Sequence, residues 1–196
     1  MSASDWIDRQ LARRGIADAR VLAAMRRVPR ERFVPEAARA HAHDDAALLL
    51  GCGQTISQPY VVALICESLA LTGTERVLDV GTGSGYQAAV LAELAAEVIS
   101  IERIPELAER ARANLAETGV EVVVGDGWAG LPERAPFEAI AVAASAPEPP
   151  PKLLEQLATG GRLVLPLGDL LVAIVKDGEE LHTKALAPVR FVPLVR

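Results

Sequence analysis

After residue 60, short apolar runs alternate with helical segments, and this alternation constrains the fold more than any other feature of the chain. The strand candidates are residues 76–80, 98–101, 121–124, 137–143 and 162–167, and the helix candidates between them are 86–95, 105–118 and 151–159. Helical crossovers of this length join parallel strands. Runs of Val, Leu, Ile and Ala are typical of strands buried on both faces. We therefore expect an α/β fold with a doubly wound, mostly parallel sheet and helices on both faces.

The two ends of the chain have different patterns. Residues 1–60 predict helices without a strong strand pattern: one ends at Gly15, a second is capped by Asp18 and stops before Pro29, and a short third covers 35–43. Beyond the parallel strands, two runs flank Asp177-Gly178 and predict a hairpin. A last strand is expected over 187–195, so the C-terminal strands should be antiparallel.

Composition excludes several classes of protein. The chain has 196 residues, enough for one domain with a sizeable core, and 20 basic against 26 acidic residues give a net charge of -6. An acidic balance argues against binding to a nucleic-acid backbone. No apolar stretch is long enough for a membrane span, and the polar start does not resemble a signal peptide. With only Cys52 and Cys66, the chain is expected in the reducing cytoplasm, Cys66 in the core.

A glycine loop joins the first parallel strand to its helix, running from Asp79 to Gly85 as G-x-G-x-G. Such a loop lets a ligand approach the backbone closely, and the helix start favours an anionic group. Glu102 ends the second strand and Asp126 the third, so both should lie at the same sheet edge as the loop. A ligand-free tight turn, a solvated acid at Glu102 and an Asx turn at Asp126 remain open alternatives.

This arrangement resembles the class I S-adenosylmethionine-dependent methyltransferases. The resemblance implies that Asp79 and the glycine loop hold the amino-acid end of the cofactor, Glu102 the ribose and Asp126 the adenine. The loop residues concerned are Gly81, Thr82, Gly83, Ser84 and Gly85. Residue 86 is Tyr, so the dinucleotide pattern G-x-G-x-x-G is absent, and no basic pocket for a pyrophosphate is evident. Both observations disfavour NAD.

Five further segments narrow the resemblance: residues 28–34 (VPRERFV), 54–60 (QTISQPY), 125–128 (GDGW), 160–163 (GGRL) and 190–194 (RFVPL). Together they are similar to the protein-L-isoaspartate (D-aspartate) O-methyltransferase family. The resemblance implies a Rossmann-like fold and methyl transfer from S-adenosyl-L-methionine to the free carboxylate of L-isoaspartyl and D-aspartyl residues in damaged proteins and peptides, which initiates repair and leaves S-adenosyl-L-homocysteine.

The same resemblance implies the site residues. Ser57 would be the active-site residue, with Thr55 and Ile56 in its loop between the cofactor sulfonium and the substrate carboxylate. Arg103 and Gly125 match further cofactor-side positions. Ser57 could instead cap a helix, because Pro59 suits a first turn. Residues 1–60 would cover the substrate and cofactor on a core of residues 61–196, as one compact domain and a monomer.

The remaining candidate functional residues are supported by weaker sequence signals. Cys52 lies between two glycines where the family usually has a polar residue, but no suitably placed histidine supports a catalytic thiol. His41 and His43 are two residues apart and would not share a helix face, so no metal site is expected. Trp128 could pack near the adenine or in the core. Two alternatives to repair stay open: a binding module that has lost turnover, and a relative that methylates normal aspartate in one peptide.

Overall fold

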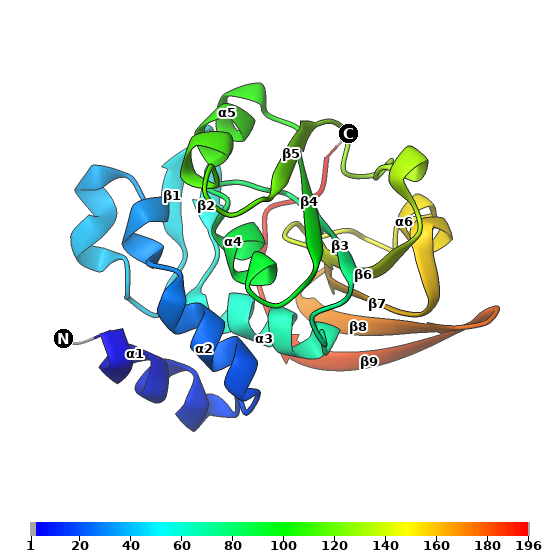
Figure 1. Ribbon diagram of the computed structural model, residues 1–196, viewed down its shortest axis with the longest axis horizontal. Coiled ribbons are helices and arrows are strands. Elements are labelled where there is room, and N and C mark those ends of the chain that lie inside the picture. Colours follow the sequence, from blue (N-terminus) through cyan, green and yellow to red (C-terminus); the bar gives the residue numbers. More distant parts are fainter. Residues whose placement is uncertain (1–2, 196) are drawn as a thin grey trace.

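The computed structural model describes residues 3–195, with side chains from Trp6 onward, and centres on a seven-stranded sheet (Figure 1). The strand order is β5-β4-β3-β6-β7-β8-β9, in which β3 to β7 pair in parallel and β8 and β9 are antiparallel. The bounds are β3 Arg76–Val80, β4 Glu97–Glu102, β5 Glu121–Val124, β6 Phe137–Val142, β7 Leu157–Leu167, β8 Leu170–Asp177 and β9 Glu180–Pro188. This Rossmann-like, mostly parallel sheet confirms the predicted fold class.

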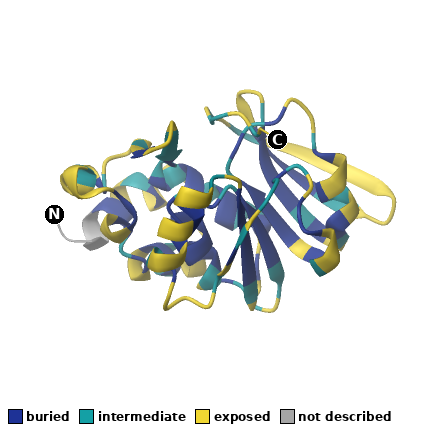
Figure 2. Ribbon diagram, turned by 90° about the horizontal axis from the view of Figure 1, so that it is seen from above, coloured by how far each residue is buried: buried dark blue, intermediate teal, exposed yellow. Residues whose placement is uncertain are grey.

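Helices cover both faces of the sheet, but unequally. One core cluster joins Val77, Val98 and Ala139 to side chains of α1, α2, α3, α4 and α5, whereas Leu78 and Ile140 face a second cluster under α6. The bounds are α1 Ala3–Gln10, α2 Ala19–Arg27, α3 Pro59–Leu69, α4 Tyr86–Ala92, α5 Pro105–Asn114 and α6 Pro151–Gln156, with 3-10 turns at Ala12–Arg14, Arg30–Phe33, Glu36–His41 and Pro132–Arg134. Central strands are accordingly buried along their length (Figure 2).

Of the two helix signals predicted near the N-terminus, the Asp18 cap is confirmed, whereas the first α-helix ends at Gln10 and a separate 3-10 turn is capped by Gly15. Asp18 caps α2, since its Oδ1 accepts the N–H groups of Arg20 (2.7 Å) and Val21 (3.3 Å). Gly15 stands at φ +102° directly after the 3-10 turn and donates its N–H to the Ala12 carbonyl. The segment packs its apolar side chains, including Trp6 and Ile7, into the larger core cluster. Burial rather than propensity therefore fixes these short helices.

The expectation that residues 1–60 lack strands is wrong. Strands β1 (Leu48–Gly51) and β2 (Gln54–Ile56) form an antiparallel hairpin beside the main sheet. The turn has three successive residues with positive φ: Gly51 at +98°, Cys52 at +54° and Gly53 at +69°. Glycine on both sides makes this turn accessible. The Gly-Cys-Gly triplet between short apolar runs was therefore the overlooked strand signal.

Two C-terminal expectations also need correction. The predicted helix over 151–159 ends at Gln156, and β7 begins at Leu157, with Gly160-Gly161 inside an irregular stretch of that strand. The hairpin at Asp177-Gly178 is confirmed, but residues 189–195 form no regular strand. Pro188 and Pro193 have no N–H to donate to a ladder. The segment instead makes a single bridge between Pro193 and Ser145.

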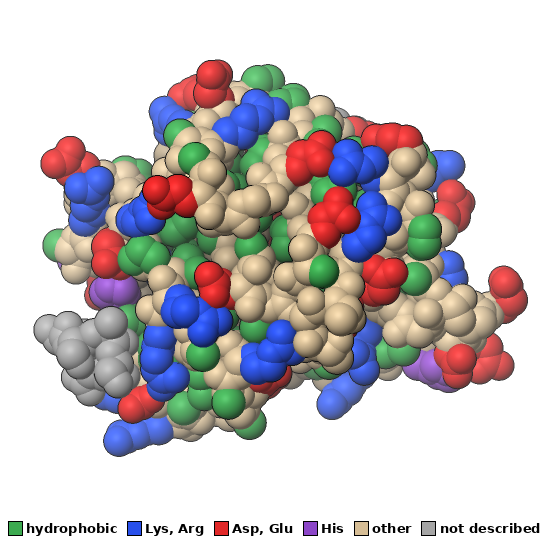
Figure 3. Space-filling view, viewed as in Figure 1, with side chains coloured by type: hydrophobic (Ala, Val, Ile, Leu, Met, Phe, Trp, Pro, Cys, Tyr) green, Lys and Arg blue, Asp and Glu red, His purple; other side chains and the backbone are tan. Residues whose placement is uncertain are grey.

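Within residues 3–195, no helix is long and apolar enough to cross a membrane. Over the face in Figure 3, acidic side chains lie among basic ones.

A carboxylate nest before β3 yields a prediction on stability. Burial alone would raise the pKa of Glu75, but hydrogen bonds from Thr72 and the backbone N–H groups of Thr72 and Gly73 outweigh it and lower the pKa from 4.5 to about 2. Because the folded pKa is depressed, this stabilisation is complete above pH 4.5 and is lost as the pH falls toward 2.

Replacing Glu75 by alanine should therefore lower the unfolding free energy at pH 7 by about 1 kcal/mol, a modest value because solvent screens this partly exposed group. Thermal unfolding of both proteins would measure this as a drop of roughly 2–4 °C. The difference should shrink at pH 3. Glu148→Ala, at an exposed loop position, is the control; an equal drop in both variants contradicts the role of the nest.

Candidate active site

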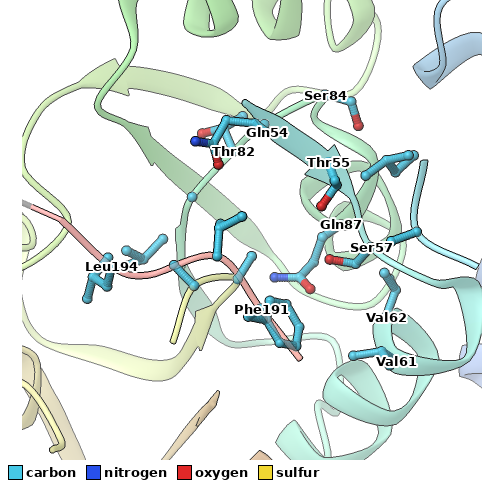
Figure 4. Close-up of a pocket in the computed structure, with 18 of the residues that line it drawn as sticks. Gln54, Thr55, Ser57, Val61, Val62, Thr82, Ser84, Gln87, Phe191 and Leu194 are labelled. Carbon is cyan, nitrogen blue, oxygen red and sulfur yellow. The ribbon is translucent and has the colours of Figure 1, made fainter. Parts of the chain in front are cut away.

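A cleft of about 670 Å³ opens at the carboxyl ends of β3, β4 and β6. Strand order reverses between β3 and β6, which is where open α/β sheets bind ligands. Four stretches supply most of the lining: residues 54–58, which include β2, the glycine loop from Val80 to Ser84, residues 101–104 at the end of β4, and residues 188–195. Segments far apart in the sequence thus meet around one space (Figure 4).

Glu102 ties the glycine loop to the end of β4. Its Oε2 accepts the Gly83 N–H (2.8 Å) and its Oε1 the Ile104 N–H (2.9 Å). The side chain is only 7% exposed and still lines the cleft. A carboxylate has about four acceptor positions, so two remain for ligand hydroxyl groups. The alternative of a solvated surface acid at Glu102 is therefore wrong.

Asp79 lies behind the loop rather than in the cleft. It is fully buried, and its carboxylate accepts hydrogen bonds from Gln87 Nε2 and Ser100 Oγ, both at 2.7 Å. Burial raises its pKa to about 6, the two hydrogen bonds oppose that rise, and the charge of Glu102 adds to it. Asp79 is not among the residues that line the cleft. Any effect on a ligand must pass through its neighbours.

Gln87 is a cleft residue that the sequence analysis overlooked. It follows Tyr86 in the first turn of α4, lines the cleft and is 6% exposed. Its Nε2 donates to Asp79, whereas its buried Oε1 has no hydrogen-bond partner among the described residues. A glutamine inside the otherwise apolar helix YQAAVLA was the available signal.

Ser57 faces the cleft from a loop that is anchored by its neighbours. Gln58 donates to Asp45 Oδ1 (2.7 Å), and Asp45 pairs with Arg14 (2.7 Å), which stacks on the ring of Tyr60. Gln58, not Ser57, is the N-cap residue of α3, with Pro59 in its first turn. The helix-capping alternative for Ser57 is therefore wrong, and its hydroxyl makes no hydrogen bond to any residue that the structure describes.

The predicted site residues divide into two groups. The cleft brings together Thr55, Ile56, Ser57, Gly81, Thr82, Gly83, Ser84, Glu102 and Arg103, while Asp79, Gly85, Gly125 and Asp126 lie outside its lining. Asp126 Oδ1 accepts the Trp128 N–H (2.9 Å), as the Asx-turn interpretation expects. Trp128 is half-buried and donates its indole N–H to the Leu194 carbonyl. The exit of β6 lines the cleft through Ala143 and Ala144.

The remaining candidates make ordinary contacts. Cys52 is exposed at the hairpin turn, with its Sγ 3.6 Å from Glu106 Oε2, and Cys66 is buried, as predicted. His41 contacts Asp44, and His43 stacks on Trp6. Among residues 3–195, no cluster of three or more His, Cys, Asp or Glu could hold a metal ion.

Comparison with known proteins identifies the family. The model of the family described as protein-L-isoaspartate(D-aspartate) O-methyltransferase matches residues 1–196. The chain belongs to this family. It is 57% identical to protein-L-isoaspartate O-methyltransferase 2 of Marinobacter nauticus over 95% of this chain and 89% of the relative. It is 52% identical to the corresponding Methanoculleus marisnigri protein over 97% and 90% of the two chains.

A solved structure agrees with the sequence relatives. A putative protein-L-isoaspartate O-methyltransferase from Plasmodium falciparum, in complex with S-adenosyl-L-homocysteine, superimposes with a TM-score of 0.85 at 26% identity, covering all of this chain and 99% of the other. Because the family match extends over the whole chain, the enzyme class of the family applies to it. This chain is an S-adenosylmethionine-dependent O-methyltransferase for isoaspartyl residues.

The glycine loop gives a prediction that separates backbone strain from packing. Gly85 stands at φ +89°, and a Cβ there would lie 2.9 Å from both Cγ and Cδ1 of Leu115. Gly85→Ala should cost about 2–4 kcal/mol of unfolding free energy from the left-handed backbone and the overpacking together. It should also weaken S-adenosylhomocysteine binding, since movement of residue 85 away from Leu115 would disturb the hydrogen bond from its N–H to the Thr82 carbonyl, which closes the loop.

Gly119→Ala is the matched control, because Gly119 stands at φ +75° with nothing within 4 Å of its added Cβ. This variant should lose about 1 kcal/mol and retain ligand affinity. Urea unfolding and calorimetric titration measure both quantities. Equal losses in the two variants would contradict the contact with Leu115.

Proposed function

We propose that this cleft methylates the free carboxylate of L-isoaspartyl and D-aspartyl residues in damaged proteins and peptides, with Ser57 orienting that carboxylate, and so initiates their repair. One observation carries the proposal: the unpartnered Ser57 hydroxyl faces the same cleft as the glycine loop and Glu102. A site for a nucleoside-bearing methyl donor and a free hydroxyl for a carboxylate thus adjoin each other. A binding module without turnover would not need that second group.

The reaction needs positioning more than acid–base catalysis. A free side-chain-type carboxyl has a pKa of about 4, so the nucleophile is already ionised at neutral pH. S-Adenosylmethionine supplies an electrophilic methyl group, whose bond to sulfur breaks with its electron pair on sulfur as the carboxylate oxygen forms the ester bond. No proton moves in this step. The chain's task is to align the carboxylate, and such alignment accounts for a large part of many enzymatic accelerations.

The cleft walls support that task. Val61, Val62 and Phe191 line it with apolar side chains beside Ser57 (Figure 4). A carboxylate and a sulfonium neutralise each other during the transfer, and their attraction is stronger where water is excluded. Ser57 and nearby backbone N–H groups would bind the carboxylate oxygen that does not react. A single hydroxyl donor leaves the other oxygen nucleophilic.

On the cofactor side, the proposed roles follow the lining of the cleft. Thr55, Ile56 and the loop from Gly81 to Ser84 would contact the amino-acid end, Glu102 the ribose hydroxyls, and Arg103 the outer edge. Asp126 would use its free Oδ2 for the adenine amino group, since Oδ1 is occupied. Asp79, Gly85 and Gly125 would shape the site without contacting its ligand. Residues 1–60 would cover both ligands, with residues 54–58 as the inner edge of that cover.

Label transfer tests the proposed function directly. The protein is mixed with methyl-labelled S-adenosylmethionine and two matched peptides that differ only in isoaspartyl against aspartyl linkage. Base-labile label on the isoaspartyl peptide alone is expected. Label on the normal peptide would instead favour methylation of ordinary aspartate, and cofactor binding without transfer would favour a binding module.

Ser57→Ala should lower kcat about 10- to 100-fold, because one orienting hydrogen bond to a charged group is lost. The affinity for S-adenosylhomocysteine should change less than about threefold, since the hydroxyl faces the substrate carboxylate. Ser68→Ala is the control, because Ser68 is another serine, within α3 (Pro59–Leu69), but lines a separate pocket. If Ser57→Ala abolishes cofactor binding while bound enzyme still turns over, the assigned role is wrong.

The proposal extends to assembly and compartment. All the lining of the cleft comes from one chain, so a monomer would suffice for activity. Cys52 and Cys66 are both free thiols, which suits the reducing cytoplasm. Light scattering after size-exclusion chromatography should give a mass near 20.7 kDa; a stable dimer would contradict this part.

A further inference from the structure

Gln87 lines the cleft, and its Oε1 is a buried acceptor for which the described residues supply no hydrogen-bond partner. The Gln87 side chain is only 6% exposed. Its amide nitrogen, Nε2, donates to Asp79 Oδ1 at 2.7 Å. Buried amide oxygens without a partner are uncommon, and each one calls for a partner that the fold itself does not supply. Because Gln87 lines the cleft, that partner can be a bound molecule.

The orientation of this amide is fixed by chemistry. An ionised carboxylate offers only acceptors, so Asp79 requires the NH₂ group of Gln87 and turns the Oε1 atom away from itself. Asp79 cannot rotate to release the amide, because its second oxygen accepts the Ser100 hydroxyl at 2.7 Å. Ser100 Oγ in turn hydrogen-bonds Thr82 Oγ1 in the glycine loop. These buried hydrogen bonds therefore fix the orientation of the Gln87 amide and leave its Oε1 free to accept a hydrogen bond.

The location of Gln87 narrows the possible donors. Gln87 lines the same cleft as Ser57, Val62 and Phe191, and Figure 4 shows their side chains around one space. A ligand at this point lies between the cofactor and substrate parts of the cleft. The buried charge of Asp79 behind the amide favours a donor that is polar or positively charged.

We infer that Gln87 Oε1 is a ligand-binding acceptor for an N–H group, positioned by Asp79. Two sources share this chemistry: the α-ammonium group at the amino-acid end of the cofactor, and a main-chain amide of the isoaspartyl peptide. The second of these sources, the peptide amide, rests on the proposed function. The inference adds to that function a residue that holds a nitrogen of one ligand while Ser57 orients the carboxylate.

Gln87→Met tests this inference, since methionine has a similar length and volume but no acceptor of comparable strength. The wild-type enzyme is assayed first: without transfer to the isoaspartyl peptide, the proposed function fails and the peptide amide is no longer a candidate donor. If the wild-type enzyme methylates the isoaspartyl peptide, Gln87→Met should raise either the dissociation constant for S-adenosylhomocysteine or the KM for the peptide about tenfold. A change of this size is expected for the loss of one hydrogen bond to a buried ligand group. A higher dissociation constant for S-adenosylhomocysteine identifies the cofactor ammonium, whereas a higher KM for the peptide at unchanged kcat identifies the peptide amide.

Gln156→Met is the matched control. Gln156 is 3% exposed, but both ends of its amide are satisfied, by the Leu131 N–H at 2.8 Å and the Ala129 carbonyl at 2.7 Å. This variant should lower the melting temperature and leave both ligand constants unchanged. If Gln87→Met behaves in the same way, with both ligand constants within twofold of wild type, the inference is overturned.

A measurement on the unaltered enzyme covers the case in which Gln87→Met does not fold. A crystal structure with S-adenosylhomocysteine and an isoaspartyl peptide should place a ligand nitrogen within about 3.2 Å of Gln87 Oε1. A water molecule or a protein group as the sole partner of that oxygen would overturn the inference.

Discussion

The cleft depends on the carboxylate of Glu102, which accepts two backbone N–H groups from different segments. One comes from Gly83 in the glycine loop and the other from Ile104 beyond β4. Parallel strands bring their carboxyl ends to one sheet edge, but they do not fix the loops that follow. A buried charge with two amide donors fixes both loops at once, because separating either donor would leave the carboxylate incompletely solvated. The same side chain remains in the cleft wall, so the group that organises the loops also faces the ligand.

Behind this surface lies a second, fully buried layer of polar contacts. Asp79 contacts Gln87 on α4 and Ser100 on β4, and Ser100 contacts Thr82 in the loop. Buried polar networks stabilise one arrangement when every member is satisfied. Here a single member, Gln87, has a buried amide oxygen without a partner among the described residues, and its side chain lines the cleft. The network therefore holds Gln87 and the glycine loop in fixed positions relative to β3 and β4.

Much of the fold could be predicted from the sequence, because apolar runs, glycines and Asp18 act locally. The parallel strands, the hairpin at Asp177-Gly178 and the α2 cap depend on such signals. The β1–β2 hairpin was missed because its strands are three and four residues long and Leu49 points to solvent, so no buried alternation marks them. The segment 189–195 was taken for a strand because apolar composition does not reveal whether a neighbouring edge is free to pair.

The candidate site could be predicted in part. Motifs located Ser57, Glu102 and the glycine loop, and the fold brings them to one cleft. The depth of each residue could not be read from the motif, since Asp79 and Thr82 are three positions apart yet only Thr82 reaches the cleft. Gln87 was missed because its importance lies in what its two amide ends contact, and spacing along a chain carries no such information.

One wall of the cleft, residues 188–195, comes from the last part of the sequence, while the floor comes from residues 80–102. The floor and this wall are far apart in the sequence, so the cleft is enclosed only when long-range contacts form, such as the hydrogen bonds that join Val192 and Leu194 to Ser145. Local loss of these few bonds would open the cleft to solvent while the sheet beneath it stays paired.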